Sequence, residues 1–391
     1  MDTLAFIQHL RALSFYQDQI VHVESLAPRH ASSGELDSPL PAPLQERLQA
    51  LGMWPLYSHQ AAALNALRRG SNVMVATPSA SGKSLCYHLP VLESLLADKL
   101  SRALYLFPTK ALAQDQRRSL QELASPGLLQ DSDCATFDGD TVQEIRAEIK
   151  RRARIVISNP DMLHLGILPN HMTWARFFQH LKYVVVDEAH VYRGVFGSHV
   201  ACVLRRLRRI CSRYGSNPRF ILCSATTANP EEHAQKLVGL PFETIKDDGS
   251  PSGGKRFVFW NPPVFEKARL ARRSANSEAA HLLAALVSYG IRSLVFTRTR
   301  KLTELVYVYA VEAIPGGRES LMAPAGIFPR IDAASSVSSS PESSEGWWPH
   351  LPWSWGWMSG DWMPPSSPAI RAAWPVPGSR RGGAGGGRRK P

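Results

Sequence analysis

The chain has 391 residues, 44% of them hydrophobic and 20% charged, which excludes a minimal disulfide-stapled scaffold and a wholly disordered polymer. At about 100–200 residues per domain, it should hold about two or three domains. Its 45 Lys and Arg against 33 Asp and Glu leave a formal net charge of +12, which weakly favours a polyanionic partner such as nucleic acid.

The cysteines and the apolar runs indicate where in the cell the protein is expected. No two of the five cysteines form a Cys-x-x-Cys pair and no histidines cluster beside them, so neither a disulfide framework nor a zinc site is expected. The N-terminus lacks a basic n-region, and no apolar run approaches the roughly 20 residues of a membrane span. The sequence therefore predicts a cytoplasmic protein without a membrane partner.

Residues 1–55 are predicted to form an N-terminal arm with one short helix, Leu44–Leu51, because prolines surround that helical pattern. Residues 56–245 are predicted to form an α/β domain, since short apolar runs alternate there with helical patterns. The expected strands are Asn72–Ala76, Ala103–Phe107, Ile155–Ser158, Tyr183–Val186 and Phe220–Cys223. Such near-continuous apolar runs are typical of parallel strands that are buried on both faces of a sheet.

Residues 246–277 are predicted to be a linker that contains one short strand, Arg256–Trp260. A second α/β unit is expected over 278–313. It would begin with the helix Glu278–Tyr289 and the strand Ser293–Thr297.

The first expected strand leads into a loop of small residues and then into a helix that begins near Leu85. The loop reads Thr77-Pro78-Ser79-Ala80-Ser81-Gly82-Lys83-Ser84. In such a turn the backbone N–H groups point to a helix N-terminus and bind nucleotide phosphates, while Lys83 would reach the phosphates and Ser84 would bind Mg²⁺. The strict motif has Gly where this chain has Thr77. The strand, loop and helix together therefore predict ATP binding, against the alternative of an ordinary helix start.

Two adjacent carboxylates, Asp187 and Glu188, follow the strand expected at Tyr183–Val186. Open α/β sheets bind ligands at this end of their strands. Asp187 would hold Mg²⁺, and Glu188 would act as the general base on the attacking water. An isolated acidic pair is more often a solvated turn, but beside a phosphate loop it predicts ATP hydrolysis.

With these two motifs, further segments in the same order resemble the superfamily 2 helicases of the DEAH type. The segments are Tyr57-Ser58-His59-Gln60, Phe107 to Gln114, Ser158 to Leu163, Asp187-Glu188-Ala189-His190, Ser224-Ala225-Thr226 and Phe296 to Arg300. The resemblance implies a RecA-like parallel-sheet domain followed by a fragment of a second one. It also implies that Gln60 reads adenine and that His190, Ser224, Ala225 and Thr226 couple the nucleotide site to strand movement.

Three local signatures narrow the resemblance to the YprA-type bacterial repair helicases, also called mitomycin repair factor A, and their fungal RecQ-related counterparts. They are Thr77 to Tyr87, Phe137 to Thr141 and His190 to His199. The resemblance covers about residues 15–310. It implies ATP-driven 3′-to-5′ translocation on single-stranded or tailed duplex DNA and unwinding in DNA repair, with RNA as an alternative substrate.

The same resemblance implies contacts with the backbone of one nucleic-acid strand, without sequence specificity. The candidate residues are Pro108, Thr109, Lys110, Gly139, Asp140, Thr141, Asn159, Pro160 and Asp161. Ordinary turn and helix-cap roles are the alternative for each of them. Four arginines at 205, 206, 208 and 209 surround an apolar helical face and form either a phosphate-binding face or a solvated basic face.

The last part of the chain departs from the family. Residues 314–391 contain neither motif V nor the Gln-x-x-Gly-Arg-x-x-Arg-like motif VI that supplies arginine fingers. They hold seven of the ten tryptophans and 12 of the 29 prolines, a low-complexity composition that predicts a disordered tail. We expect a truncated or out-of-frame end after about Val311. Stacking of the tryptophans on single-stranded bases is the alternative for the tail.

These observations predict an ATP-dependent DNA helicase of superfamily 2 whose activity in this chain is reduced or lost. The first alternative is a module that binds ATP and nucleic acid without helicase activity. The second is a P-loop ATPase that binds no nucleic acid, which the segments around Lys110 and Asn159 disfavour.

Overall fold

The computed structural model describes residues 3–124, 127–225, 227–266, 271–291, 293–297 and 299–314. The chain divides into a larger unit, Arg29–Ser252, and a smaller unit whose described residues lie within 3–28 and 253–314. The divisions therefore fall after Pro28 and Ser252, rather than after residues 55 and 245 as the sequence predicts. Residues 315–391, which include the expected tail, lie outside the described residues.

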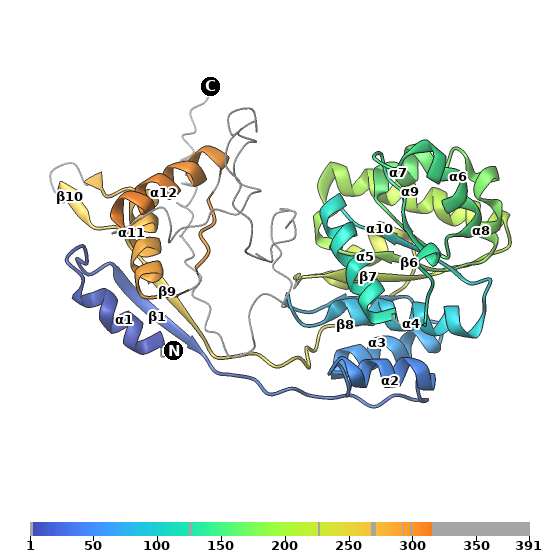
Figure 1. The fold of residues 1–391 in the computed structure, drawn as a ribbon, viewed down its shortest axis with the longest axis horizontal. Helices are drawn as coiled ribbons and strands as arrows, with labels where there is room; N and C mark the ends of the chain where they lie inside the picture. The colour runs from blue at the N-terminus through green and yellow to red at the C-terminus, as the bar shows by residue number, and fades with distance from the viewer. Residues whose placement is uncertain are drawn as a thin grey trace, which may run out of the picture. The chain divides into compact units, whose positions relative to one another are not determined.

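The larger unit is built on a seven-stranded sheet in which every neighbouring pair is parallel, in the order β4-β5-β3-β6-β7-β2-β8 (Figure 1). The strands are β2 (Val73–Ala76), β3 (Arg102–Leu106), β4 (Cys134–Thr136), β5 (Ile155–Ser158), β6 (Leu181–Val186), β7 (Arg219–Ser224) and β8 (Glu243–Ile245). The five predicted strands and the RecA-like parallel sheet are confirmed. The two strands at the edges, β4 and β8, are absent from the sequence prediction.

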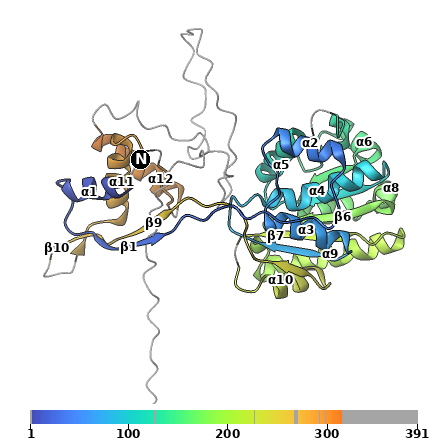
Figure 2. The same cartoon turned by 90° about the horizontal axis from the view of Figure 1, so that it is seen from below.

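Helices cover both faces of this sheet (Figure 2). One face carries α2 (Ala42–Ala50), α3 (Ser58–Arg68), α4 (Lys83–Ala97) and α5 (Lys110–Ala124), and the other carries α6 (Gln143–Arg152), α8 (Ala175–Gln179), α9 (Gly194–Arg213) and α10 (Pro230–Val238). The short α7 (Pro160–Met162) follows β5. Strand residues alternate between two apolar cores, because Val73 and Val75 pack on the first face and Met74 on the second.

In the smaller unit, the N-terminal segment pairs with a strand from the far end of the sequence. Strand β1 (Ile20–Leu26) is antiparallel to β9 (Lys255–Trp260). The other elements are α1 (Thr3–Ala12), β10 (Val264–Glu266), β11 (Ala271–Arg272), α11 (Ala275–Ser288) and α12 (Arg300–Ala313). The predicted strand at 256–260 and helix at 278–289 are confirmed, whereas the first half of the expected arm is a helix and a strand.

A buried carboxylate connects these elements. Glu278 is 0% exposed and accepts hydrogen bonds from Trp260 Nε1 at 2.7 Å, Arg273 Nη1 at 2.9 Å and Gln19 Nε2 at 3.4 Å. The expected strand at 293–297 is wrong, since these residues form no strand. A strand needs a hydrogen-bonded neighbour, and the described residues provide none for this segment.

No helix in the described part of the chain combines the length and apolarity that a bilayer crossing requires.

Candidate nucleotide and nucleic-acid sites

Most of the predicted site residues follow a strand of the larger unit. Because its strands are parallel, the loops after β2, β3, β4, β5, β6 and β7 all begin at one edge of the sheet. These loops carry the phosphate loop, Pro108–Lys110, Gly139–Thr141, Asn159–Asp161, the acidic pair and Ser224–Ala225. Gln60 reaches this edge from α3, and Thr226 lies outside the described residues.

The phosphate loop turns tightly between β2 and α4. Ala80 and Gly82 have φ angles of +61° and +77°, and the hydroxyls of Thr77 and Ser81 are hydrogen-bonded at 2.8 Å. Lys83 is only 7% exposed, and its ammonium donates to the carbonyls of Thr77 at 2.9 Å and Pro78 at 2.8 Å. Lys83 is therefore held inside the curve of its own loop, where nucleotide phosphates bind in P-loop proteins.

Gln60, on the neighbouring helix α3, is hydrogen-bonded to this loop. Its Nε2 donates to the Gly82 carbonyl at 3.0 Å, and its Oε1 accepts from the Tyr57 amide at 2.9 Å. A Cβ at Gly82 would come within 2.7 Å of Gln60 Nε2, so both the left-handed φ and the close approach require glycine there. The contact that the structure shows is with the loop, and the reading of adenine by Gln60 stays a prediction.

The acidic pair stands directly after β6. Asp187 Oδ1 accepts from the Glu188 amide at 2.8 Å, and Asp187 Oδ2 accepts from the Tyr87 hydroxyl at 3.0 Å. Glu188 has a φ of +51° and is 3% exposed, so the chain bends sharply where its carboxylate is placed. Tyr87 is four residues after Lys83 on α4, which places both side chains on one helical face.

Burial dominates the electrostatics of this cluster. It lowers the pKa of Lys83, while Cys223, Glu188 and Asp187 act in the opposite direction. It also raises the pKa of Asp187, against the hydrogen bonds from the Glu188 amide and Tyr87 and the charge of Lys83. The ammonium and the carboxylates are thus close enough to stabilise one another's charged forms in a desolvated setting.

One of the predicted coupling residues, His190, adjoins Glu188. His190 Nδ1 lies 3.1 Å from Glu188 Oε2, and burial lowers the pKa of His190. The imidazole of His233 on α10 contacts the Ala189 carbonyl at 2.8 Å. Ser224 is buried and its hydroxyl donates to the Ala225 carbonyl at 2.8 Å. The acidic pair is therefore connected to α10, while the coupling role of these residues stays a prediction.

The predicted nucleic-acid residues after β3 and β4 contact each other. Lys110 Nζ lies 2.5 Å from Asp140 Oδ2, with the two side chains 47% and 77% exposed. The loop itself is organised by Asp138, whose Oδ1 accepts from the amides of Asp140 at 3.0 Å and Thr141 at 3.1 Å. Arg146 then donates to the carbonyls of Thr141 at 2.9 Å and Asp138 at 3.1 Å.

The remaining candidates have local roles. Asn159 Oδ1 accepts from the Met162 amide at 2.7 Å and so caps the short α7, with Pro160 buried and Asp161 exposed. Thr109 Oγ1 accepts from the Leu112 amide at 3.3 Å at the start of α5, and Pro108 is half-buried beside it. These caps fix the loops, and the same loops leave Lys110, Gly139, Asp140 and Asp161 exposed at the sheet edge.

Two of the four arginines on α9 contact the end of α10. Arg205 donates to the Lys236 carbonyl at 3.0 Å, and Arg208 donates to the carbonyls of Val238 at 3.1 Å and Gly239 at 3.0 Å. They cap the C-terminal end of α10, where cations are favourable. These two therefore have a structural role that neither sequence interpretation contained.

Sequence reasoning missed several residues that shape these sites. Tyr87 could have been found from its spacing of four after Lys83, and Asp138 from its place within the Phe137–Thr141 signature. His59 lies within the Tyr57–Gln60 motif, but its contact is with a distant segment: it is buried, accepts from the Gly249 amide at 3.3 Å, and its pKa is lowered by burial.

The DEAD/DEAH box helicase family matches residues 57–233, a range that contains the phosphate loop and the acidic pair. The uncharacterized ATP-dependent helicase YprA of Bacillus subtilis is 45% identical over 301 residues, which are 76% of this chain and 40% of that protein. The ATP-dependent helicase HRQ1 of Saccharomyces cerevisiae is 42% identical over 321 residues, 81% of this chain and 30% of that protein.

Among solved structures, the DUF1998 helicase MrfA bound to DNA and AMPPNP matches with a TM-score of 0.76 and 42% identity, over 82% of this chain and 44% of that chain. The chain thus spans less than half the length of these relatives. The matched motifs, the parallel sheet and the order of the loops agree with one another. Residues 57–233 therefore carry a DEAD/DEAH box helicase domain, and the chain is similar to the YprA-type helicases.

Proposed function

We propose that Arg29–Ser252 is the ATP-binding motor domain of a helicase that uses ATP hydrolysis to move along DNA and separate its strands in repair. The observation that carries this proposal is the cluster of buried Lys83 and Glu188 with half-buried Asp187 beside the phosphate loop. A desolvated cation and two carboxylates at the carboxyl edge of a parallel sheet fit a magnesium nucleotide.

The residues of the cluster have distinct roles in this proposal. Lys83 would exchange its bonds to the Thr77 and Pro78 carbonyls for bonds to the nucleotide phosphates. Asp187, held by Tyr87, and the Ser84 hydroxyl at the start of α4 would hold Mg²⁺, which supplies charge neutralisation when bound. Glu188, which is buried and has a φ of +51°, would take the proton of the attacking water.

DNA is the proposed track for two reasons. MrfA binds DNA, and the exposed loops around Lys110 and Asp161 stand at the same sheet edge as the nucleotide cluster. The proposal would place strand contacts at Pro108–Lys110, Gly139–Thr141 and Asn159–Asp161. An equal affinity for RNA and DNA strands of one sequence, measured at one salt concentration, would contradict the DNA assignment.

A second candidate is a module that binds ATP and DNA without separating strands. It is favoured by the sequence after Arg300, which contains no Gln-x-x-Gly-Arg-x-x-Arg pattern to supply arginine fingers. In GTPases a finger of this kind is worth about 10³–10⁵ in rate. On this reading the chain binds ATP at an unaltered cluster and turns it over slowly.

The experiment that tests the proposal measures ATP hydrolysis by the 391-residue chain with and without single-stranded DNA, with Lys83→Ala as the blank. A 3′-tailed duplex is assayed in parallel for strand separation. DNA-stimulated turnover above the blank together with unwinding supports the helicase. Nucleotide and DNA binding without either activity supports the second candidate, and an absence of nucleotide binding contradicts both.

A further inference from the structure

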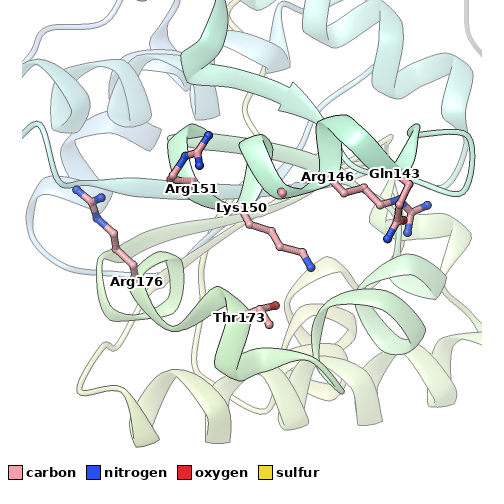
Figure 3. A pocket seen from close by; sticks show the side chains of 7 residues that line it. Gln143, Arg146, Lys150, Arg151, Thr173 and Arg176 are labelled. Atoms are coloured by element: carbon pink, nitrogen blue, oxygen red, sulfur yellow. The ribbon is translucent and has the colours of Figure 1, made fainter.

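A pocket of about 510 Å³ lies on the larger unit between α6 and the segment that enters α8 (Figure 3). We call it the α6 pocket. Its polar lining consists of Gln143, Arg146, Lys150, Arg151, Thr173 and Arg176. It is separate from the nucleotide cluster, with which it shares no residue.

The lining of the α6 pocket is strongly cationic. Four of its side chains are Arg or Lys, and among the described residues no Asp or Glu lines it. The acidic residues of α6 are directed elsewhere: Glu148 pairs with Arg152 at 3.1 Å, and neither it nor Glu144 belongs to the lining. Four cations around one hollow repel each other unless an anion lies between them, so the pocket favours a polyanion.

Two of the four cations are held in place by aromatic rings. The Arg146 guanidinium lies 5.3 Å from the centre of the Phe137 ring, and the Lys150 ammonium lies 6.0 Å from that of Trp174. In Figure 3, Lys150 extends from α6 toward Thr173 across the hollow. These charges are therefore positioned before any ligand arrives.

The other two cations have unused donors. Arg151 and Arg176 are exposed, and within the described ranges neither side chain makes a hydrogen bond. Arginine guanidinium groups offer several N–H donors in a geometry that matches phosphate oxygens. The pocket thus combines fixed charges with free donors, which is the chemistry that binds phosphate groups.

Arg146 connects the pocket to the predicted nucleic-acid loop. The same side chain lines the pocket and donates to the carbonyls of Asp138 and Thr141, on either side of Gly139 and Asp140. A nucleic-acid backbone that contacts Gly139–Thr141 therefore has a cationic surface adjoining it along α6. The exposure of the lining suits a polymer that runs across it better than an enclosed small molecule.

We propose that the α6 pocket binds backbone phosphates of DNA beyond the nucleotides that contact Gly139–Thr141. This inference rests on the proposed DNA track. Its ligand chemistry is the phosphodiester, and the occupant is the DNA itself rather than free phosphate.

The test replaces the two cations whose side chains make no hydrogen bond to the described part of the chain, in the double variant Arg151→Gln with Arg176→Gln. The matched control is Lys99→Gln with Arg213→Gln, which removes the same charge from exposed positions outside the pocket. Fluorescence anisotropy measures the affinity for a 3′-tailed duplex at several salt concentrations. Thermal unfolding of each variant checks that it is folded.

The pocket variant should bind DNA about tenfold more weakly than the control, and its plot of log affinity against log salt should be shallower by about 0.7–0.9 for each lost phosphate contact. Equal DNA affinity and equal salt dependence in the two variants would contradict the DNA contact at the α6 pocket but not the proposed function. If millimolar inorganic phosphate raised the unfolding temperature of the wild type but not of the pocket variant, and both bound DNA equally well, the pocket would be a site for free phosphate instead. A wild type that binds ATP and not DNA would overturn both proposals.

Discussion

The nucleotide cluster and the nucleic-acid loops share one sheet edge but differ in their exposure to solvent. Lys83 and Glu188 are 7% and 3% exposed, whereas the side chains of Lys110 and Asp140 are 47% and 77% exposed. Buried charges depend on fixed partners, because water cannot compensate for a lost one. Exposed charges are solvated and screened, so each contributes little alone.

Single substitutions should therefore have different effects in the two regions. In the cluster, one side chain should decide binding or chemistry. In the loops, backbone organisation by Asp138 should matter more than any one exposed charge.

Glu188→Gln should lower ATP hydrolysis by about 10²–10⁴-fold while nucleotide binding is retained, because the amide cannot take a proton from water. Steady-state turnover and binding of a fluorescent ATP analogue measure the two effects. Glu46→Gln, an exposed glutamate on α2, is the control. Turnover equal to that of the control would remove Glu188 from the chemistry.

Asp138→Ala should cost about 2–3 kcal/mol of unfolding free energy, since it leaves the Asp140 and Thr141 amides without their acceptor. DNA affinity should fall with it, because the loop loses its shape. Urea denaturation and anisotropy measure both. Asp138→Asn keeps an acceptor oxygen and should recover most of each loss; equal losses in the two variants would mean that the charge, and not the loop, matters.

The buried side of α4 should make the fold acid-sensitive. Burial lowers the pKa of His88 from 6.5 to about 3. The unfolded chain therefore takes up a proton as pH falls below 6.5 and the folded chain does not, so stability decreases on acidification. From pH 6.5 to pH 5 the loss should be about 2 kcal/mol.

Between pH 6.5 and pH 5, His88→Gln should lose about 2 kcal/mol less unfolding free energy than the wild type loses. Urea denaturation at each pH measures this difference. His164→Gln, at an exposed position, should behave as the wild type does. The same acid dependence in the wild type and His88→Gln would show that His88 is accessible to protons in the fold.

The smallest effect should come from the exposed ion pair. Asp140→Asn should strengthen DNA binding about two- to threefold, because Lys110 loses its carboxylate partner and becomes available to phosphate. The comparison is Asp247→Asn, an exposed aspartate, in the same anisotropy assay. Weaker binding by Asp140→Asn would show that the Asp140 carboxylate, and not only the backbone of its loop, contributes to nucleic-acid binding.

Local sequence patterns predicted the central strands and the loops that follow them, because apolar runs such as Ile155–Ser158 are buried on both faces. The three-residue strands β4 and β8 are too short to show such a pattern. They are strands because they pair with β5 and β2. The pairing of β1 with β9 joins distant segments of the sequence, and no local period indicates it. The expected strand at 293–297 shows the converse, an apolar run without a neighbour among the described residues.

The site was predictable where chemistry requires fixed spacing, as in the phosphate loop and the acidic pair. It was not predictable where contacts depend on tertiary structure. The bond from Gln60 to Gly82 and the caps that Arg205 and Arg208 place on α10 join separate elements. The motifs predict that Gln60 contacts adenine and that the arginines lie on a phosphate-binding or solvated face. The structure shows hydrogen-bond partners within the protein for Gln60, Arg205 and Arg208.

The most direct test of the central claim measures binding of a fluorescent ATP analogue with Mg²⁺ to the wild type, Lys83→Ala and the exposed control Lys99→Ala. Loss of charge-assisted bonds to phosphate should weaken binding by Lys83→Ala on the order of 30-fold or more, with the control unchanged. Equal affinities for all three proteins would contradict the nucleotide site at the edge of this sheet.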